Sequence, residues 1–393
     1  MNWLQYALIL TVLLYPATSK KYGAPLKRTH KLARNLDEIA LQMKTLRSDL
    51  EYFADINGNN PHTQPFYAVG RNSYISNVSV GTPPQEFRVM LDTGSADFWI
   101  PTRDCQVGQS GQACNKTLFN SDNSSTFQNL STTFQIRYGT GFVEGTTANE
   151  TVGLGSPNDD KLVVPKQTIG LAHKIDKLLN RFGFDGIVGL AFRALSKVEA
   201  QPVFLNALDQ GLVDEPVFTI WLTRDKTEKN NTQDGLITYG GHDDEHCDSD
   251  IHWIPLAAKS WWIFEGQGFS INGQKTDKTF KAITDSGTSF IVGHPTIIQP
   301  ILDAVNAQYY PPAHIYLVPC SSNITVGFTI NGKDYNVEAK NLLLPIKGDT
   351  CVLAVNIFEN DNVQLILGDP FIREYCQVHD VKEGRVGFAL AKE

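Results

Sequence analysis

Two aspartates of the chain occur in nearly the same four-residue context. Asp92 begins the sequence Asp-Thr-Gly-Ser, and Asp285 begins Asp-Ser-Gly-Thr. Each follows a short apolar run, so each carboxylate is expected on a tight turn where a strand ends. The glycine of each turn allows a backbone amide to approach the carboxylate, and the hydroxyl side chains offer further donors. One such turn is ordinary turn chemistry, but two of them suggest a shared site.

Two carboxyl groups brought together have a well-established chemistry. Because like charges at short range cannot both be ionised comfortably, the pair holds one proton between them. The ionised member can take a proton from a bound water, while the protonated member hydrogen-bonds a carbonyl oxygen. Water then attacks the carbonyl carbon directly. The pair Asp92 and Asp285 is therefore a candidate for hydrolysis without a covalent intermediate.

The elements that must position this pair form an internal repeat. Ile-Val-Gly at 187–189 follows the first aspartate, and Ile-Leu-Gly at 366–368 follows the second at a similar separation. An aspartate tetrapeptide and a later Ile-Val-Gly or Ile-Leu-Gly segment thus occur twice in the same order. Two related halves that meet across a pseudo-twofold axis are the natural architecture.

The body of the chain is expected to be mainly β. After Pro65, short apolar runs such as 87–91, 134–138 and 328–330 are separated by Gly, Pro and Asn. Only two stretches have a convincing helical pattern, Val203–Gln210 and Pro295–Tyr310. The fold class is therefore all-β in the main, with two lobes and a cleft between them.

The first 60 residues differ from the rest. Residues 4–15 are an apolar run that is too short to span a bilayer, which needs about 20 residues. We expect a signal peptide that ends near Ser19, the alternative being a buried N-terminal helix. From Leu32 to Leu50, apolar residues recur at helical spacing, which predicts an amphipathic helix. The polar sequence at 57–61 then predicts an exposed linker.

Charge is unevenly distributed along the chain. The 393 residues carry a net charge of −8, yet the segment 20–51 holds eight Lys or Arg against four Asp or Glu. The body is therefore strongly acidic, which argues against nucleic acid as a partner. The basic leader and the acidic body are more plausibly partners of each other, and the leader is expected to be a removable pro-segment.

The cysteines and the N-glycosylation sequons indicate the cellular compartment of the protein. Six cysteines favour three disulfides in a secreted chain. Seven Asn-x-Ser/Thr acceptors fit the secretory pathway, with either an extracellular or a lysosome-like acidic destination. These glycosylation candidates are Asn77, Asn115, Asn123, Asn129, Asn149, Asn230 and Asn323.

The sequence resembles the pepsin family of aspartic endopeptidases from about Phe66 to the C-terminus. The resemblance is carried by many motifs in the same order, which makes it specific. They are Val-Gly-Thr-Pro-Pro-Gln at 80–85, the tetrapeptides at Asp92 and Asp285, Trp99, Tyr-Gly-Thr-Gly at 138–141, Phe-Asp-Gly-Ile-Val-Gly-Leu at 184–190 and Ile-Leu-Gly-Asp-Pro-Phe at 366–371.

The resemblance implies an aspartic endopeptidase that cleaves between bulky apolar residues at acidic pH and is made as a secreted zymogen. Asp92 and Asp285 would be the catalytic pair. Ser95, Thr288, Gly94 and Gly287 would hydrogen-bond the pair or the substrate. Tyr138, Gly139 and Thr140 would lie on a flap that closes over the substrate, with Trp99 as the partner of Tyr138. Leu178, Phe184 and Ile187 would form the apolar wall next to the scissile bond.

The resemblance also implies the disulfides Cys105–Cys114 and Cys320–Cys351. The pair that remains, Cys247–Cys376, has no counterpart in pepsin itself. The chain departs from the family at Ala96-Asp97, where Ser-Asn is usual. This change leaves both carboxylates and their nearest hydroxyls in place.

The expected domain organisation has four parts: a signal peptide at 1–19, a basic pro-segment at 20–60, an N-terminal lobe at 61–235 and a C-terminal lobe at 236–393. The expected partners are protein or peptide substrates and the chain's own pro-segment. A monomer is expected, with no membrane span, no cofactor and no metal.

Three rival interpretations were weighed. The tract 242–247, with His252 beyond it, could be a metal site, but adjacent polar residues on one turn rarely converge on an ion. A serine hydrolase would need a Gly-x-Ser-x-Gly elbow, which the chain lacks. An inert pepsin-like binding protein is the alternative that stays open, although the intact motifs argue against it.

Overall fold

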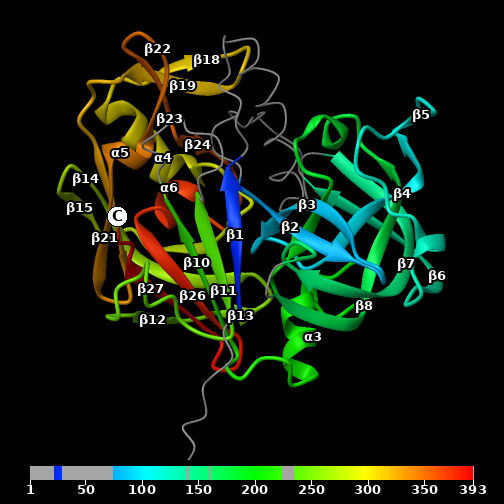
Figure 1. The fold of residues 1–393 in the computed structure, drawn as a ribbon. Coiled ribbons are helices and arrows are strands. Elements are labelled where there is room, and N and C mark those ends of the chain that lie inside the picture. Colours follow the sequence, from blue (N-terminus) through cyan, green and yellow to red (C-terminus); the bar gives the residue numbers. More distant parts are fainter. Residues whose placement is uncertain (1–21, 29–73, 139–140, 159–160, 224–233, 393) are drawn as a thin grey trace, which may run out of the picture.

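The computed structural model describes residues 74–138, 141–158, 161–223 and 234–392. It also describes the strand at 22–28, for which only the backbone is considered. The described part of the chain is mainly β, with 52% of its residues in strands and 11% in helices. Figure 1 shows the strands β2 to β8 gathered on one side and the labelled strands from β10 onward on the other, while β9 pairs with β3 and β4. The prediction of a mainly β fold is confirmed.

One long sheet runs through both sides of the described chain. Its hydrogen-bonded path is β12-β27-β26-β10-β11-β1-β2-β3-β9-β4-β8-β7-β6, with β5 paired to β4. The strands are β1 Tyr22–Arg28, β2 Tyr74–Val80, β3 Gln85–Asp92, β4 Phe98–Val107, β5 Gln112–Ala113, β6 Gln128–Tyr138, β7 Gly141–Leu154, β8 Leu162–Ile175, β9 Gly186–Gly189, β10 Val217–Leu222, β11 Gly235–Tyr239, β12 His252–Pro255, β26 Tyr375–Asp380 and β27 Arg385–Leu390.

Two further sheets build the C-terminal side. The larger has the path β21-β20-β14-β16-β25-β17-β24, with β13 and β15 paired to β14, and the smaller has the order β18-β19-β23-β22. Their strands are β13 Ala258–Lys259, β14 Trp262–Ile271, β15 Gln274–Thr276, β16 Phe280–Thr284, β17 Ile291–Gly293, β18 Gln308–Tyr310, β19 Ile315–Pro319, β20 Thr325–Ile330, β21 Lys333–Glu338, β22 Leu343–Lys347, β23 Thr350–Leu353, β24 Val355–Ile357 and β25 Leu365–Leu367.

Helices are few and short in the described chain. The α-helices are α3 Val203–Asp209, α4 Pro295–Ala304, α5 Ala339–Leu342 and α6 Asp369–Ile372, and the 3-10 helices are η1 Ser121–Asn123, η2 Leu179–Arg181 and η3 Arg193–Leu195. The expected helix at Val203–Gln210 is present as α3. The expected helix Pro295–Tyr310 was too long, because Asn306 takes a left-handed φ of 49° and the chain then turns into β18.

The strand β1 belongs to the segment that the sequence assigns to the leader. It pairs antiparallel with β11 on one side and with β2 on the other. In Figure 1 this blue strand lies between the two sides of the molecule. No strand is predicted at residues 22–28 from the sequence. The expected signal peptide, amphipathic helix and linker lie outside the described residues.

Two large apolar clusters form the cores of the two sides. The first includes Phe87, Phe204 and Phe218, and the second includes Phe264 and Phe328. Trp262 belongs to the first cluster although it begins β14 of the C-terminal side, and its Nε1 donates to the carbonyl of Leu190 at 3.1 Å. The two sides are thus joined by packing as well as by the long sheet.

All six cysteines are paired. The disulfides are Cys105–Cys114, Cys247–Cys376 and Cys320–Cys351, as expected. In the part of the chain that the structure describes, no helix is long and apolar enough to cross a membrane.

Candidate active site

The two aspartates lie at the ends of equivalent strands. Asp92 ends β3, whose last residues pair in parallel with β9. Asp285 follows β16, which pairs in parallel with β25 in the same way. The segments 187–189 and 366–368 are thus the neighbouring strands that hold each aspartate turn. The internal repeat of the sequence corresponds to a repeat in structure.

Each carboxylate receives the same set of local hydrogen bonds. The amide of Gly94 donates to Asp92 Oδ1 at 2.8 Å, and the hydroxyl of Ser95 donates to Asp92 Oδ2. The amide of Gly287 donates to Asp285 Oδ1 at 2.8 Å, and the hydroxyl of Thr288 donates to Oδ2 at 2.5 Å. Each turn therefore fixes the plane of its own carboxylate.

The glycines of the two turns are required by the close approach of the opposite carboxylate. A Cβ on Gly94 would lie 2.7 Å from Asp285 Cγ, and a Cβ on Gly287 would lie 2.7 Å from Asp92 Oδ1. Neither distance leaves room for a side chain. The structure thus brings Asp92 and Asp285 together, with each carboxylate beside the glycine of the opposite turn.

The second residue of each tetrapeptide links the two halves. Thr93 Oγ1 donates to the carbonyl of Thr284 at 3.1 Å and accepts from the amide of Ser286 at 3.0 Å. Ser286 Oγ donates to the carbonyl of Leu91 at 2.8 Å and accepts from the amide of Thr93 at 3.1 Å. These reciprocal bonds lock the two turns to each other, so the pair is held rigidly.

Both carboxyl groups are buried, with 6% of Asp92 and 5% of Asp285 exposed. Burial raises the pKa of both, because a charged carboxylate loses its hydration. For Asp92 the negative charge of Asp285 raises the pKa further, while the hydrogen bonds from Ser95 and Gly94 oppose the rise. Both carboxyls therefore hold a proton to a higher pH than an exposed aspartate does.

The hairpin of β6 and β7 carries Tyr138, one of the residues that the sequence assigns to a flap. Tyr138 ends β6 and lies opposite Gly141 at the start of β7. The Nε1 of Trp99 donates to the hydroxyl of Tyr138 at 2.9 Å, and both side chains are buried. Gly139 and Thr140, which the sequence also assigns to the flap, lie outside the described residues.

An apolar cluster lies beside the flap. It contains Trp99, Tyr138, Phe184 and Ile187, four of the residues that the sequence assigns to the substrate site. Leu178 is half-buried at the N-cap of η2 and is not a member of this cluster. Of the three residues expected to form the apolar wall, Phe184 and Ile187 lie in this cluster.

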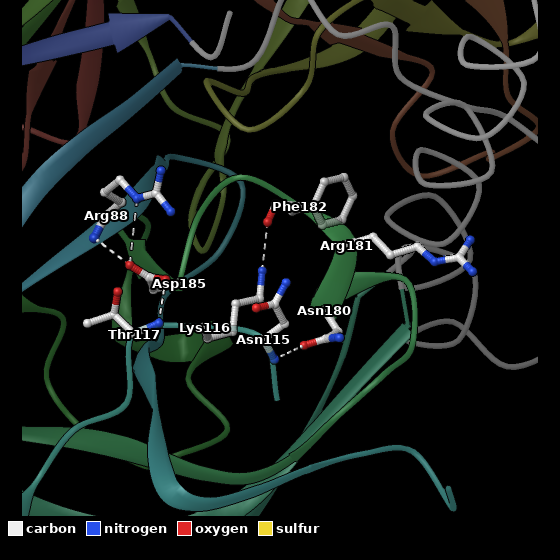
Figure 2. Close-up of a pocket in the computed structure, with 8 residues that line it drawn as sticks. All are labelled: Arg88, Asn115, Lys116, Thr117, Asn180, Arg181, Phe182 and Asp185. Atoms are coloured by element: carbon white, nitrogen blue, oxygen red, sulfur yellow. Dashed lines mark hydrogen bonds and ion pairs between the residues drawn. The ribbon is translucent and has the colours of Figure 1, made fainter. Parts of the chain in front are cut away.

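A polar hollow of about 550 Å³ is lined in part by Phe182 and Asp185, which flank Phe184 in the sequence (Figure 2). Lys116 enters it and donates to the carbonyls of Phe182 at 2.9 Å and Phe184 at 2.6 Å. Burial lowers the pKa of Lys116 to about 8, so the ammonium stays charged in acid. Asp185 accepts from the amides of Arg88 and Thr117 at 2.9 Å each. These contacts fix the backbone of the segment that carries Phe184.

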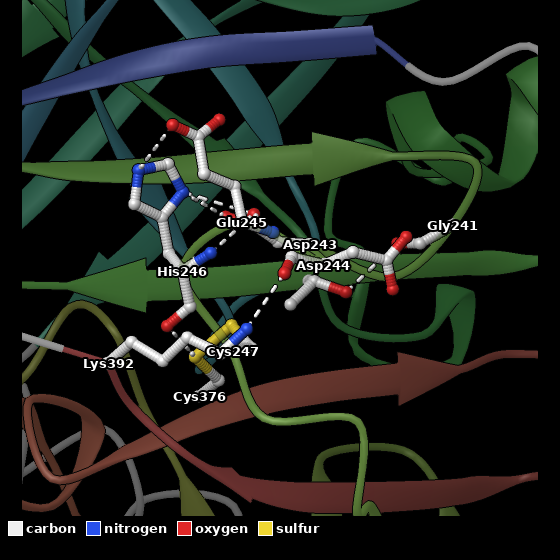
Figure 3. Close-up of polar contacts among 9 residues, drawn as sticks. Gly241, Asp243, Asp244, Glu245, His246, Cys247, Cys376 and Lys392 are labelled. Atoms are coloured by element: carbon white, nitrogen blue, oxygen red, sulfur yellow. Dashed lines mark hydrogen bonds and ion pairs between the residues drawn. A yellow bond between two sulfur atoms is a disulfide. The ribbon is translucent and has the colours of Figure 1, made fainter.

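Hydrogen bonds and a disulfide hold the residues of the tract 242–247 in place (Figure 3). The Asp243 carboxylate accepts from the amides of Glu245 and His246, and it also contacts His246 Nδ1 at 2.9 Å. The His246 ring stacks on Trp221, and Cys247 is bonded to Cys376. Within the described ranges, no group of three or more His, Cys, Asp or Glu could hold a metal ion.

The sequons differ in accessibility. Asn77 lies in β2, is half-buried, and donates to Glu86 Oε1 at 2.6 Å and Ser156 Oγ at 3.0 Å. Asn149 is half-buried in β7 and accepts from the hydroxyl of Thr168. The exposed sequon residues of the described chain are Asn115, Asn123, Asn129 and Asn323. Asn230 lies outside the described residues.

Three residues at the site were not predicted from the sequence to have a functional role. Thr93 and Ser286 were noticed only as parts of the tetrapeptides, although a hydroxyl at the second position of both copies was a usable signal. Lys116 carried no such signal, because its carbonyl partners lie more than 60 positions later in the chain.

Comparison with known proteins gives a consistent result. Residues 73–391 match the family model for eukaryotic aspartyl proteases. The chain is 33% identical to aspartic protease 2 of Necator americanus, over 84% of this chain and 86% of that protein. It is 35% identical to chymosin of Callithrix jacchus, over 81% of each. It is also 35% identical to a probable vacuolar protease A of Arthroderma benhamiae, over 81% of this chain and 78% of the relative.

Proposed function

Because this chain belongs to the eukaryotic aspartyl proteases, an endopeptidase family, we propose that Asp92 and Asp285 are its catalytic pair. The proposed reaction is hydrolysis of peptide bonds between bulky apolar residues at acidic pH. The observation that carries this proposal is the symmetric pair of turns, which places two buried carboxyls next to each other, each held by the amide of its own glycine.

In the proposed mechanism one carboxyl is ionised and the other carries the shared proton. The ionised member takes a proton from a bound water while the protonated member hydrogen-bonds the scissile carbonyl oxygen. The water oxygen adds to the carbonyl carbon and forms a tetrahedral diol. The diol collapses as the C–N bond breaks, and a proton from the pair passes to the leaving amine. Tyr138 would close over the substrate and exclude bulk water.

Digestion of denatured globin tests this proposal. We expect cleavage that is fastest in acid and is blocked by a peptide inhibitor with a hydroxyl group in place of the scissile amide. Globin left intact across the whole acidic range by the correctly processed protein would favour the alternative, an inert pepsin-like binding protein. The intact carboxyls, hydroxyls and Tyr138 support the enzyme over this alternative.

We expect a strong preference for bulky apolar residues just before the scissile bond. Phe184, Ile187 and Tyr138 provide an apolar lining, and each buried methylene of a substrate contributes about 0.8 kcal/mol. Leu should therefore exceed Ala at that position by about tenfold to a hundredfold in kcat/KM. Sequencing the products from a peptide library measures this preference. A profile dominated by Lys, Arg or Asp would refute the assigned wall.

The Lys116→Met variant should weaken substrate binding more than turnover. Without the ammonium, the carbonyls of Phe182 and Phe184 lose their donor, and each unsatisfied buried group costs about 1–3 kcal/mol. The wall then loosens, so KM for an apolar peptide should rise several-fold. Arg181→Gln is the matched control, because Arg181 lines the same hollow but points away from Lys116 in Figure 2. Equal KM values for Lys116→Met and the wild type would contradict this role.

We further propose the organisation and processing that the sequence indicates: a signal peptide at 1–19, an inhibitory pro-segment at 20–60, and lobes at 61–235 and 236–393. The position of β1 between β2 and β11 supports a leader that is integrated with the body. The name of the vacuolar relative is consistent with the proposed acidic compartment of the secretory pathway. Asn115, Asn123, Asn129 and Asn323 are the preferred glycosylation sites, and the active form is proposed to be a monomer.

A further inference from the structure

The turn that carries Asp92 is clamped along its length by one later segment. Three amides of that segment donate to backbone carbonyls of the turn: Leu190 to Asp92 at 2.7 Å, Ala191 to Ser95 at 2.8 Å and Gly189 to Asp97 at 2.9 Å. The segment then leaves the turn, passes through η3 and returns at residues 196–198. Asp97 bonds to this segment at both places: its backbone carbonyl accepts from Gly189, and its side chain accepts from residues 196–198.

The side chain of Asp97 closes this clamp. Only 2% of the residue is exposed. Its Oδ1 accepts from the hydroxyl of Ser196 at 2.7 Å and from the amide of Val198 at 3.1 Å. Both carboxylate oxygens accept from the amide of Lys197 at 3.0 Å. The hydroxyl of Ser196 in turn accepts from the amide of Ala200 at 3.1 Å.

The clamp also reaches the C-terminal side. Ala96 packs with Ala191 and Leu195, and Trp261 contacts this cluster. The amide of Phe192 donates to the carbonyl of Ser260 at 3.1 Å. The segment that Asp97 holds is therefore in contact with both sides of the molecule, next to the turn of Asp92.

We propose that Asp97 is a positioning residue for the reaction, whose acceptor oxygen fixes the Asp92 turn by holding residues 196–198 against it. This inference rests on the proposed role of Asp92. The donors to its side chain are a hydroxyl and backbone amides, so the requirement at this position is an acceptor rather than a charge. Burial raises the pKa of Asp97, which fits a site that tolerates a neutral acceptor.

Asp97→Ala tests the proposal by separating kcat from KM. A turn that shifts by a fraction of an ångström misplaces Asp92, so we expect kcat to fall about tenfold to a hundredfold with KM within about twofold. Asp97→Asn keeps Oδ1 and should recover most of the loss. Ser196→Ala removes one of the donors to Asp97 and should lower kcat by a smaller factor. It tests the same proposal if Asp97→Ala does not fold. Asp243→Ala is the matched control, because Asp243 is also buried and also accepts from two loop amides, but in the tract 242–247.

Hydrogen exchange at the amides of Lys197 and Val198 reports the clamp independently of catalysis. We expect faster exchange in Asp97→Ala and near wild-type exchange in Asp97→Asn. Faster exchange with an unchanged kcat in Asp97→Ala would overturn the positioning role, as would a kcat in Asp97→Asn as low as in Asp97→Ala. If Asp92→Asn were also fully active, the assignment of the catalytic pair would be the part that fails.

Discussion

Asp92→Asn and Asp285→Asn are each expected to lower kcat by about 10² to 10⁴-fold, because each removes one partner of the proton transfer. The amide cannot accept the proton of the water, and it cannot carry the shared proton. Both substitutions preserve shape, so the hydrogen bonds from Ser95 and Thr288 keep an oxygen acceptor. Steady-state kinetics on an apolar peptide measures the loss.

The same variants should gain thermal stability at neutral pH. The folded-state pKa of both aspartates lies above that of the unfolded chain, so the folded state binds the proton more tightly. The stabilisation that the protonated aspartates give the folded state is therefore complete in strong acid, and it is lost as the pH rises above about 4. Asn does not titrate, so the Tm of either variant should exceed that of the mature wild type at pH 7 and match it near pH 3. Full activity in either folded variant would refute the catalytic pair.

The proform is expected to be silent at pH 7 and to activate in acid. The segment 20–51 is basic and the body is acidic, so the two attract each other near neutrality. As the pH falls towards about 4, carboxylates of the body become protonated while Lys and Arg stay charged, and the attraction weakens. If the leader covers the cleft in about 99% of molecules at pH 7, activity should lie about a hundredfold below that of the mature enzyme.

Activation should also require the strand β1 to leave the long sheet, because Tyr22–Arg28 pairs with β11 and β2. Holding the purified proform at pH 7 and pH 4, with N-terminal sequencing beside the activity assay, follows the process. A new N-terminus between Pro61 and Tyr67 is expected only in acid. A proform with its leader attached that is as active at pH 7 as the mature enzyme would show that the leader does not inhibit.

The sequence was informative wherever a local pattern repeats. The two tetrapeptides and the segments 187–189 and 366–368 predicted two equivalent strand ends, and β3 with β9 and β16 with β25 have that arrangement. The predicted strands at 87–91, 134–138 and 328–330 lie within β3, β6 and β20. These features depend on alternating apolar residues and on turns, which are properties of short segments.

The sequence was less informative where a residue acts through a distant partner. Thr93 bonds to Ser286 and Thr284 of the other half, and Asp97 bonds to residues about 100 positions later. The departure at Asp97 was visible in the sequence, but its donors are the hydroxyl of Ser196 and two backbone amides, and residue type does not identify an amide donor. The strand β1 was missed for a similar reason, because its pairing with β2 and β11 is set by the sheet.

The pH dependence of kcat/KM for the mature wild-type enzyme on one apolar peptide tests the shared proton most directly. The account predicts a maximum in acid with a fall on both sides. The acidic fall comes from protonation of the second carboxyl, and the basic fall from loss of the proton that Asp92 and Asp285 share. A kcat/KM that stays level or keeps rising from about pH 4 to pH 8 would contradict a mechanism that needs one ionised and one protonated carboxyl.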